Sequence, residues 1–310
     1  MPLLVAAFLI AGLLVACDRS APPPVDRLVL AAGSAHDAVA RALADVINDR
    51  WHIPVEVHPT GGSVDNLSQV DDGQADLGFA TLDVTHLATQ GDTPFEAAQA
   101  VAPLAALYDD YLHVVVPDPS PVRTLADLAG RRVSLGSAAS GTPVIAERVL
   151  ATAGVRVTEH SWLHLDTAQA ADRLALGTID AFFVTGGRPT PAVADLARRR
   201  PIRLLPVTDD TGRLRDESGQ YYHERFVTAG VYGLDAEVAT VGVATVVVVP
   251  RSMPDAVADA LTAVLFDAQP RLVDAHAEAR ALDARSAIAV APLVLHPGAI
   301  AYYRRTKPLA

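Results

Sequence analysis

Lysine is almost absent from this chain, because Lys307 is the only one among 310 residues and arginine supplies the rest of the positive charge. A P-loop and a Schiff-base site both depend on a lysine, so neither is expected in the body of the chain. The formal net charge of −11 argues against a nucleic-acid partner, which would require a basic surface. It says little about a small ligand, because the local field of a pocket can oppose the overall sign.

Cysteine occurs once, at Cys17, directly after an apolar segment without charged side chains. A short apolar segment, small residues and then a cysteine are typical of a bacterial lipoprotein signal, although no Lys or Arg precedes this one. Residues 1–17 are therefore predicted to be a signal segment ending at a lipidated Cys17, and residues 18–26 a proline-stiffened tether. The protein is expected to be extracytoplasmic, lipid-anchored and free of disulfides. A buried cysteine behind a short anchor helix is the alternative.

Two stretches 104 positions apart, 73–80 and 177–184, have the same pattern of a glycine, an aspartate and an apolar run. Gly73 and Gly177 can take the left-handed conformation that ends a helix, and the apolar runs are typical of buried strands. Asp76 and Asp180, just before those strands, suit turn chemistry better than acid–base catalysis. Each unit is predicted to be a helix that returns into a sheet.

Strands and helices alternate along the chain, which is expected of a mostly parallel sheet. Strands are predicted at 27–32, 54–57, 77–80, 132–135, 179–184 and 202–207, and helices at 38–47, 64–70, 124–129, 143–153, 167–176, 191–198 and 254–282.

Two further apolar strands, 111–116 and 241–249, are too short to span a membrane and are interpreted as crossings between two lobes. The chain is long enough for two cores. The predicted fold class is therefore α/β and two-lobed, with hinge strands between the lobes. Residues 27–112 and 242–310 are assigned to lobe 1, and residues 113–241 to lobe 2.

Two loops rich in glycine and hydroxyls, 60–63 and 137–142, each open a predicted helix. The first N–H groups of a helix and its dipole attract an anion, so two such loops facing each other would clamp a carboxylate. Thr81 follows a strand at the carboxyl edge of the sheet, where open α/β folds bind ligands.

Enzyme chemistry needs a nucleophile with a base, a cofactor loop or a set of metal ligands. Residues 136–141 fit neither Gly-x-Ser-x-Gly nor Gly-x-Gly-x-x-Gly. His160 and His164 have a spacing compatible with metal binding, but no cysteine accompanies them. We therefore expect no catalytic residue, no metal and no cofactor.

In order and spacing, the motifs of the chain resemble those of the TAXI family of substrate-binding proteins, the receptors of one class of TRAP-type (tripartite) transporters. The resemblance covers nearly the whole mature chain and is carried by Thr60-Gly61-Gly62-Ser63-Val64-Asp65-Asn66-Leu67, Gly73 with Asp76, Asp127-Leu128-Ala129-Gly130-Arg131-Arg132-Val133-Ser134-Leu135-Gly136, Ser140-Gly141-Thr142, Gly177 through Asp180, Tyr232, Thr240-Val241, and His296-Pro297-Gly298-Ala299 with Tyr302-Tyr303.

The resemblance implies a type II periplasmic-binding-protein fold that closes like a hinge over one solute and delivers it to an ion-driven membrane permease. It also implies a small carboxylate ligand, such as glutamate, glutamine or a related dicarboxylate. The loop at 33–36 departs from the family, whose members usually have a longer glycine-rich stretch there. A receptor for a sensor kinase or chemoreceptor is an alternative, and an extracytoplasmic enzyme on the same fold is another.

The candidate ligand contacts are mainly glycines and hydroxyls at strand ends and helix starts. Ser63 could instead cap its helix, Tyr232 could be a core tyrosine, and Arg188 could face water rather than grip a carboxylate. The candidates are Gly33, Ser34, Gly62, Ser63, Thr81, Ser137, Ser140, Gly141, Thr142, Thr185, Gly186, Gly187, Arg188 and Tyr232.

Overall fold

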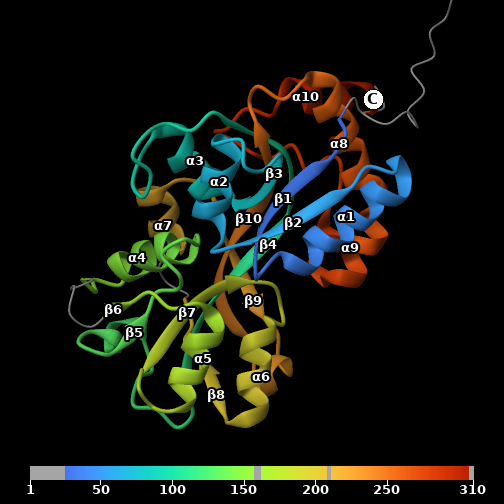
Figure 1. Cartoon of the computed structure of the whole chain (residues 1–310). Helices are drawn as coiled ribbons and strands as arrows, with labels where there is room; N and C mark the ends of the chain where they lie inside the picture. Colours follow the sequence, from blue (N-terminus) through green and yellow to red (C-terminus); the bar gives the residue numbers. More distant parts are fainter. Residues whose placement is uncertain (1–24, 157–161, 208–210, 307–310) are drawn as a thin grey trace, which may run out of the picture.

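The computed structural model describes residues 25–156, 162–207 and 211–306, and shows two α/β lobes joined by two long strands (Figure 1). Cys17, the proposed tether up to Pro24, and His160 lie outside these residues. Within the described ranges no helix is long and apolar enough to span a bilayer.

The first lobe begins with three parallel strands and the helices that connect them, as the alternating pattern predicted. Its elements are β1 (Leu28–Gly33), α1 (Asp37–Trp51), β2 (Val55–Thr60), α2 (Ser63–Asp71), β3 (Leu77–Thr81) and α3 (Leu82–Gln90). The C-terminal part of the chain returns to this lobe through α8 (Asp255–Asp267), α9 (Gln269–Ala275), η3 (Ala277–Ala281) and α10 (Pro297–Thr306).

The second lobe repeats the arrangement on a smaller scale. Its elements are η1 (Leu125–Leu128), β5 (Val133–Ser134), α4 (Thr142–Thr152), β6 (Trp162–Leu163), α5 (Thr167–Ala175), β7 (Ala181–Gly186), α6 (Pro191–Arg199), β8 (Ile202–Leu204), α7 (Thr211–Ser218), β9 (Tyr222–Val227) and η2 (Val231–Gly233).

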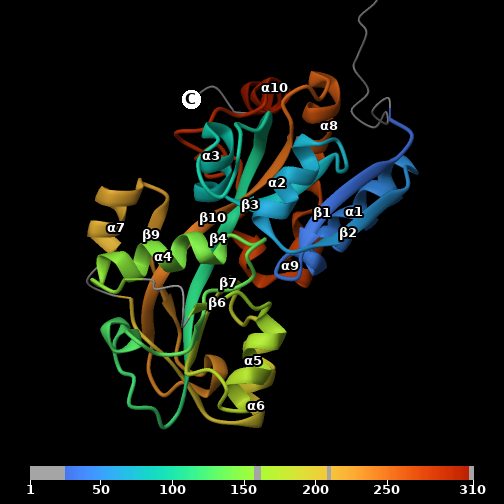
Figure 2. The ribbon, with the colours of Figure 1, turned by 60° about the vertical axis from the view of Figure 1, so that its left-hand side comes forward.

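The two lobes share one continuous sheet, with strand order β2-β1-β3-β10-β4-β7-β5-β6. Its centre is an antiparallel pair, β4 (Val101–Pro117) and β10 (Val238–Pro250), which runs from one lobe into the other (Figure 2). These are the two predicted crossings. β4 begins ten residues before the predicted strand, because Pro103 interrupts the apolar pattern near its start. Proline is tolerated there because it lies beside an irregularity in the pairing of β4 with β10.

Several elements were missed or misassigned. The predicted helix at 124–129 is the 3-10 turn η1, and the predicted single helix at 254–282 is broken into α8, α9 and η3. Helices α3, α7 and α10 and strand β9 were not predicted. Strand β9 pairs with β10 and has three consecutive polar residues at its centre, His223, Glu224 and Arg225, so it lacks an apolar run.

The predicted glycine turns are confirmed. Gly73 and Gly177 have φ angles of 72° and 70°, the left-handed region in which glycine avoids the steric cost of a side chain. Each follows the C-cap residue of its helix, α2 and α5 respectively, and each leads into the next strand.

Asp76 and Asp180 fasten the starts of their strands to the neighbouring strand in the same way. The N–H of Asp76 donates to the Val29 carbonyl at 2.8 Å, and its Oδ2 accepts from the Val29 N–H at 2.8 Å. Asp180 exchanges the matching bonds with Arg132, at 2.8 and 2.9 Å. Both aspartates therefore have a structural role, as their position indicated.

We expect Asp180→Asn to be destabilising near neutral pH and to reduce the acid sensitivity of the fold. Its hydrogen bond from the Arg132 guanidinium holds the pKa of Asp180 below the ordinary value. Because the folded pKa is below the unfolded one, this stabilisation is complete above about pH 4 and is lost as the pH falls through the folded pKa. Urea unfolding at about pH 7 and about pH 3 measures both effects.

The matched control is Asp195→Asn, which removes only an exposed pair with Arg198 on the same helix. If Asp180→Asn loses as much stability as wild type on acidification, the proposed origin of that sensitivity is wrong.

Candidate ligand-binding site

A cavity of about 340 Å³ lies between the lobes, where strands of both lobes end and the following helices begin. Its size falls in the range of small-molecule sites. From the first lobe and the hinge it is lined by Gly33, Ser34, Ala35, His36, Thr60, Gly61, Gly62, Ser63, Thr81 and Asp110. From the second lobe it is lined by Gly136, Ser137, Ser140, Gly141, Thr142, Asp166, Thr167, Ala168, Val184, Thr185, Thr190, Pro191 and Ala192.

The N-terminal ends of helices α1 to α6 all border this cavity, since the first residue of each helix or the residue just before it is among the lining residues. A helix N-terminus has a partial positive charge, and its first N–H groups have no partner within the helix. Helix ends from both lobes thus give the cavity a positive potential that suits a negatively charged group.

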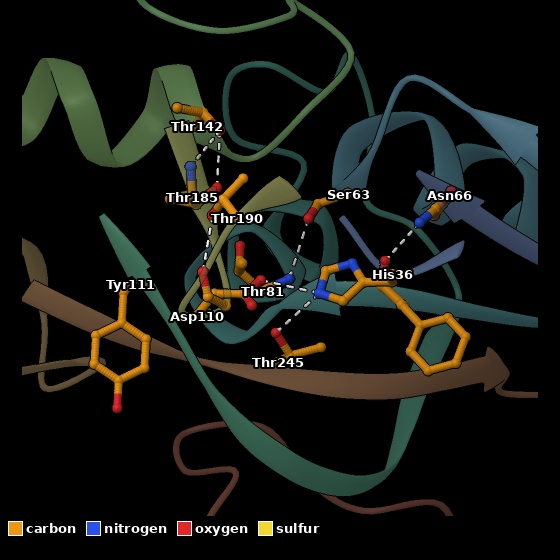
Figure 3. Close-up of polar contacts among 12 residues, drawn as sticks. His36, Ser63, Asn66, Thr81, Asp110, Tyr111, Thr142, Thr185, Thr190 and Thr245 are labelled. Carbon is orange, nitrogen blue, oxygen red and sulfur yellow. Dashed lines mark hydrogen bonds and ion pairs between the residues drawn. The ribbon is translucent and has the colours of Figure 1, made fainter. Parts of the chain in front are cut away.

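In each lobe, a hydroxyl at a helix start is tied to the end of a strand (Figure 3). The Thr81 N–H donates to Ser63 Oγ at 3.2 Å, and the Thr185 N–H donates to Thr142 Oγ1 at 3.3 Å. The hydroxyls of Thr142 and Thr185 also bond to each other at 2.8 Å. Ser63 is the first residue of α2, whose cap is Gly62, so the alternative that Ser63 caps this helix is wrong.

The two predicted loops do face each other, but they touch directly. The Asp65 N–H, at the start of α2, donates to the Ala139 carbonyl of the opposite lobe at 3.1 Å. A Cβ on Gly62 would lie 2.8 Å from the Cβ of Ser140. The glycines therefore let the lobes meet. The Asp65 N–H already has a partner, so the expectation that the first N–H groups of this helix are all free for a ligand is wrong.

The loops at 60–63 and 137–142 do not occupy equivalent positions in the two lobes. α2 and α5 start 104 positions apart, at residues 63 and 167, and so do β3 and β7, at 77 and 181. The counterpart of loop 60–63 is therefore the stretch at 164–167, while loop 137–142 corresponds to loop 33–36. Asp166, Thr167 and Ala168 were missed as lining residues, although extending the offset of 104 to residue 63 would have indicated them.

A buried pair of titratable residues was missed as well. His36 Nε2 lies 2.9 Å from Asp110 Oδ2 and 3.4 Å from the Thr245 hydroxyl (Figure 3). Burial by itself would raise the pKa of Asp110, but the charge and hydrogen bond of His36, with help from His276, hold it below its ordinary value. These residues are far apart in the sequence and belong to different elements, so no local pattern joins them.

Ten of the predicted contacts line the cavity: Gly33, Ser34, Gly62, Ser63, Thr81, Ser137, Ser140, Gly141, Thr142 and Thr185. The other four, Gly186, Gly187, Arg188 and Tyr232, do not, and they need correction.

Arg188 is held by protein groups. Its Nε donates to Glu278 at 2.9 Å, its Nη1 donates to the Phe226 carbonyl at 2.6 Å, and its guanidinium lies over the Tyr111 ring, 4.3 Å from the centroid. These partners lie outside the residues that line the cavity, so the contacts of the side chain support neither alternative. Instead it joins lobe 2 to η3 of the first lobe.

The remaining three residues support the cavity wall. The Tyr232 hydroxyl accepts from the Thr190 N–H at 2.6 Å and lies 3.2 Å from His113 Nε2, behind a lining residue. Gly186 packs against Thr190, and a Cβ on Gly187 would overlap the His276 ring.

Within the described residues no cluster of three or more His, Cys, Asp and Glu side chains is arranged to hold a metal ion. His164 instead lies 3.3 Å from the Gly136 carbonyl through its Nδ1.

A family model described as the NMT1-like family matches residues 31–306. Among solved structures, the alkanesulfonate-binding protein SsuA from Xanthomonas axonopodis pv. citri, bound to MOPS, is 19% identical, with a TM-score of 0.55 over 92% of this chain and 85% of that one. The aliphatic sulphonate binding protein SsuA from Escherichia coli is 15% identical, with a TM-score of 0.50 over 92% and 80%.

MatC from Rhodopseudomonas palustris, with bound malate, is 15% identical, with a TM-score of 0.55 over 83% of this chain and 90% of that one. At these identities the likeness shows the fold, and the predicted α/β, two-lobed periplasmic-binding-protein architecture is confirmed.

Proposed function

The chain belongs to the NMT1-like family, and on that premise we propose that it is an extracytoplasmic solute receptor which closes over a small carboxylate and delivers it to a membrane transporter. The observation that supports this proposal most strongly is the cavity between the lobes, which is bordered by the N-termini of helices from both lobes. Solved relatives of this fold hold acids, MOPS in one case and malate in another.

In this proposal, the cavity binds an anion without using a cationic side chain. No arginine or lysine is among the described residues that line it. A carboxylate would instead accept hydrogen bonds from helix N–H groups and from hydroxyls such as those of Ser63 and Thr142. Because both lobes supply these groups, the bonds form together only when the lobes are closed, which couples binding to closure.

The motifs that resemble the TAXI family support a finer proposal, in which the partner is a TRAP-type permease. We also propose that lipidated Cys17 anchors the protein outside the cytoplasmic membrane, that the lobes comprise residues 27–112 with 242–310 and residues 113–241, and that the protein is not an enzyme. A receptor that presents its solute to a sensor kinase or chemoreceptor would use the same cavity, and a gene neighbour encoding a permease or a kinase distinguishes the two.

The test of the receptor proposal is the melting temperature of the soluble form that begins near Asp26, measured against amino acids, dicarboxylates and 2-oxoacids. A ligand that binds only the folded state adds about 2.7 kcal/mol at a hundredfold excess over its Kd. A shift with one class of acid, the compound being recovered unchanged, supports a receptor. Turnover of the compound would establish an enzyme instead, and no shift with any acid would contradict the carboxylate proposal.

Ser63→Ala and Thr142→Ala are each expected to weaken binding of that acid about tenfold, since each removes a hydroxyl from the cavity and an acceptor from a buried N–H. Calorimetric titration measures the change, and Thr262→Val, a buried threonine in α8, is the control. If both alanine variants bind like wild type, the hydroxyls do not contact the ligand.

A further inference from the structure

We infer that the ligand also carries a protonated amine, which binds at a subsite formed by Asp110 and Thr81 beside the hinge strands. This inference rests on the proposed receptor function and narrows the ligand to an amino acid, in which one carboxylate and one ammonium group are close together.

Both subsite residues have a buried polar atom that has no partner in the described parts of the chain. Asp110 is 1% exposed, and its Oδ1 has no hydrogen-bond partner among the described residues, although Oδ2 is bonded to His36. Thr81 is 3% exposed, and its Oγ1 has none either. Buried polar atoms in folded proteins nearly always have partners, and each one left without costs about 1–3 kcal/mol. Because both residues line the cavity, a bound ligand is placed to supply the missing partners.

The chemistry of Asp110 decides which partner it needs. An ionised carboxylate only accepts hydrogen bonds, so the group that meets Oδ1 must be a donor. The neighbouring imidazole of His36 favours the ionised form of Asp110. A hydrogen bond between a charged donor and a carboxylate is about twice as strong as one between neutral groups, which favours an ammonium over a hydroxyl.

The distribution of charge separates an amino acid from a dicarboxylate with no amine. Among the described lining residues, the titratable side chains are Asp110, Asp166 and His36. The positive potential comes from helix ends, whereas at the hinge Asp110 is paired with His36 through Oδ2 and leaves Oδ1 as an acceptor. A carboxylate directed to the helix ends and an ammonium directed to Oδ1 of Asp110 satisfy both, while a second carboxylate near Oδ1 would bring no hydrogen-bond donor to it.

The subsite also lies next to the contact between the lobes. Thr81 ends β3 of the first lobe, and a Cβ added to Gly141 of the second lobe would lie only 2.9 Å from Thr81 Oγ1. Asp110 is on β4 and its neighbour Thr245 is on β10, the two strands that join the lobes. An amine bound here would therefore contact the closing surface and the hinge together.

The experiment compares acids with one carbon skeleton and a different group at C2. Full-length protein is titrated calorimetrically with alanine, lactate and pyruvate, and with glutamate, 2-hydroxyglutarate and 2-oxoglutarate. In the set that fits the cavity, the amino acid is expected to bind at least about tenfold more tightly than its hydroxy and oxo analogues. Asp110→Asn is expected to abolish that preference, and Thr81→Val to reduce it, while Thr262→Val leaves it unchanged.

The outcomes test the amine subsite separately from the proposed receptor function on which it rests. Equal binding of the oxo or hydroxy acid by the wild-type protein, or an intact preference in both Asp110→Asn and Thr81→Val, overturns the amine subsite and leaves a carboxylate receptor in place. Binding of none of the six acids contradicts both. Thr81→Val keeps the test valid if Asp110→Asn fails to fold, because Thr81 has no part in the His36 pair.

Discussion

Gly141→Ala is expected to weaken ligand binding about tenfold or more, while the unliganded protein melts at the wild-type temperature. The added Cβ would lie 2.9 Å from Thr81 Oγ1 and 3.2 Å from Ser63 Oγ, both on the opposite lobe. Overpacking of this kind costs about 1–3 kcal/mol. The backbone at Gly141 has a φ of −79°, which alanine adopts freely, so no strain arises within lobe 2 itself. The cost therefore falls on the closed state.

Calorimetry with the acid identified in the melting screen, together with thermal unfolding without ligand, separates the two effects. Gly141→Leu, with a longer side chain, is expected to abolish binding. The matched control is Gly212→Ala in α7, where a Cβ would meet no atom within 4 Å. Wild-type affinity in Gly141→Ala would show that ligand-bound lobes do not approach as closely as the structure describes.

Arg148→Met is expected to lower ligand affinity about a hundredfold by leaving a buried carboxylate without its cation. Asp83 of α3, on the first lobe, has a side chain that is only 1% exposed. Its Oδ2 accepts from the Tyr222 hydroxyl at 2.7 Å and lies 3.6 Å from Arg148 Nη1 of α4, on the second lobe. Removing one partner of a buried ion pair costs about 3–5 kcal/mol. Opening of the cleft relieves that cost by admitting water to Asp83.

The expected loss is therefore in ligand affinity, with a smaller change in unfolding of the free protein. Small-angle X-ray scattering of Arg148→Met should show a more open average shape than wild type. Tyr222→Phe, which removes only the bridging hydroxyl, is expected to have a milder effect of about tenfold. Arg213→Met, at an exposed pair with Glu217, is the control. If Arg148→Met loses unfolding free energy and no affinity, the cluster stabilises the fold and not the closure.

Sequence patterns predicted most elements of both lobes because each element buries one apolar face, and that face repeats with the period of its own backbone. β1, α1, β2, α2 and β3 all appear within a few residues of their predicted positions. The failures have local causes. Pro103 interrupts the apolar run that begins β4, and β9 has three consecutive polar residues at its centre.

The candidate site was partly predictable for a related reason. Glycines and hydroxyls that follow a strand and open a helix are recognisable by position, and ten such residues line the cavity. Arg188 was indistinguishable from a ligand contact by its position after β7, since its partner Glu278 is 90 residues away. His36 and Asp110, 74 residues apart, likewise have no local signal.

The sequence by itself determined the α/β alternation, the repeated helix-to-strand unit, the two crossing strands and the kind of residue that borders the cavity. All of these depend on interactions between residues close in the chain, which have a fixed spacing. Only the tertiary structure decided that loops 60–63 and 137–142 touch, that Arg188 and Arg148 join the lobes, and that Asp110 of the cavity lining has an oxygen with no partner among the residues the structure describes. Those contacts depend on how two separately folded lobes meet, and no periodicity within either lobe encodes that meeting.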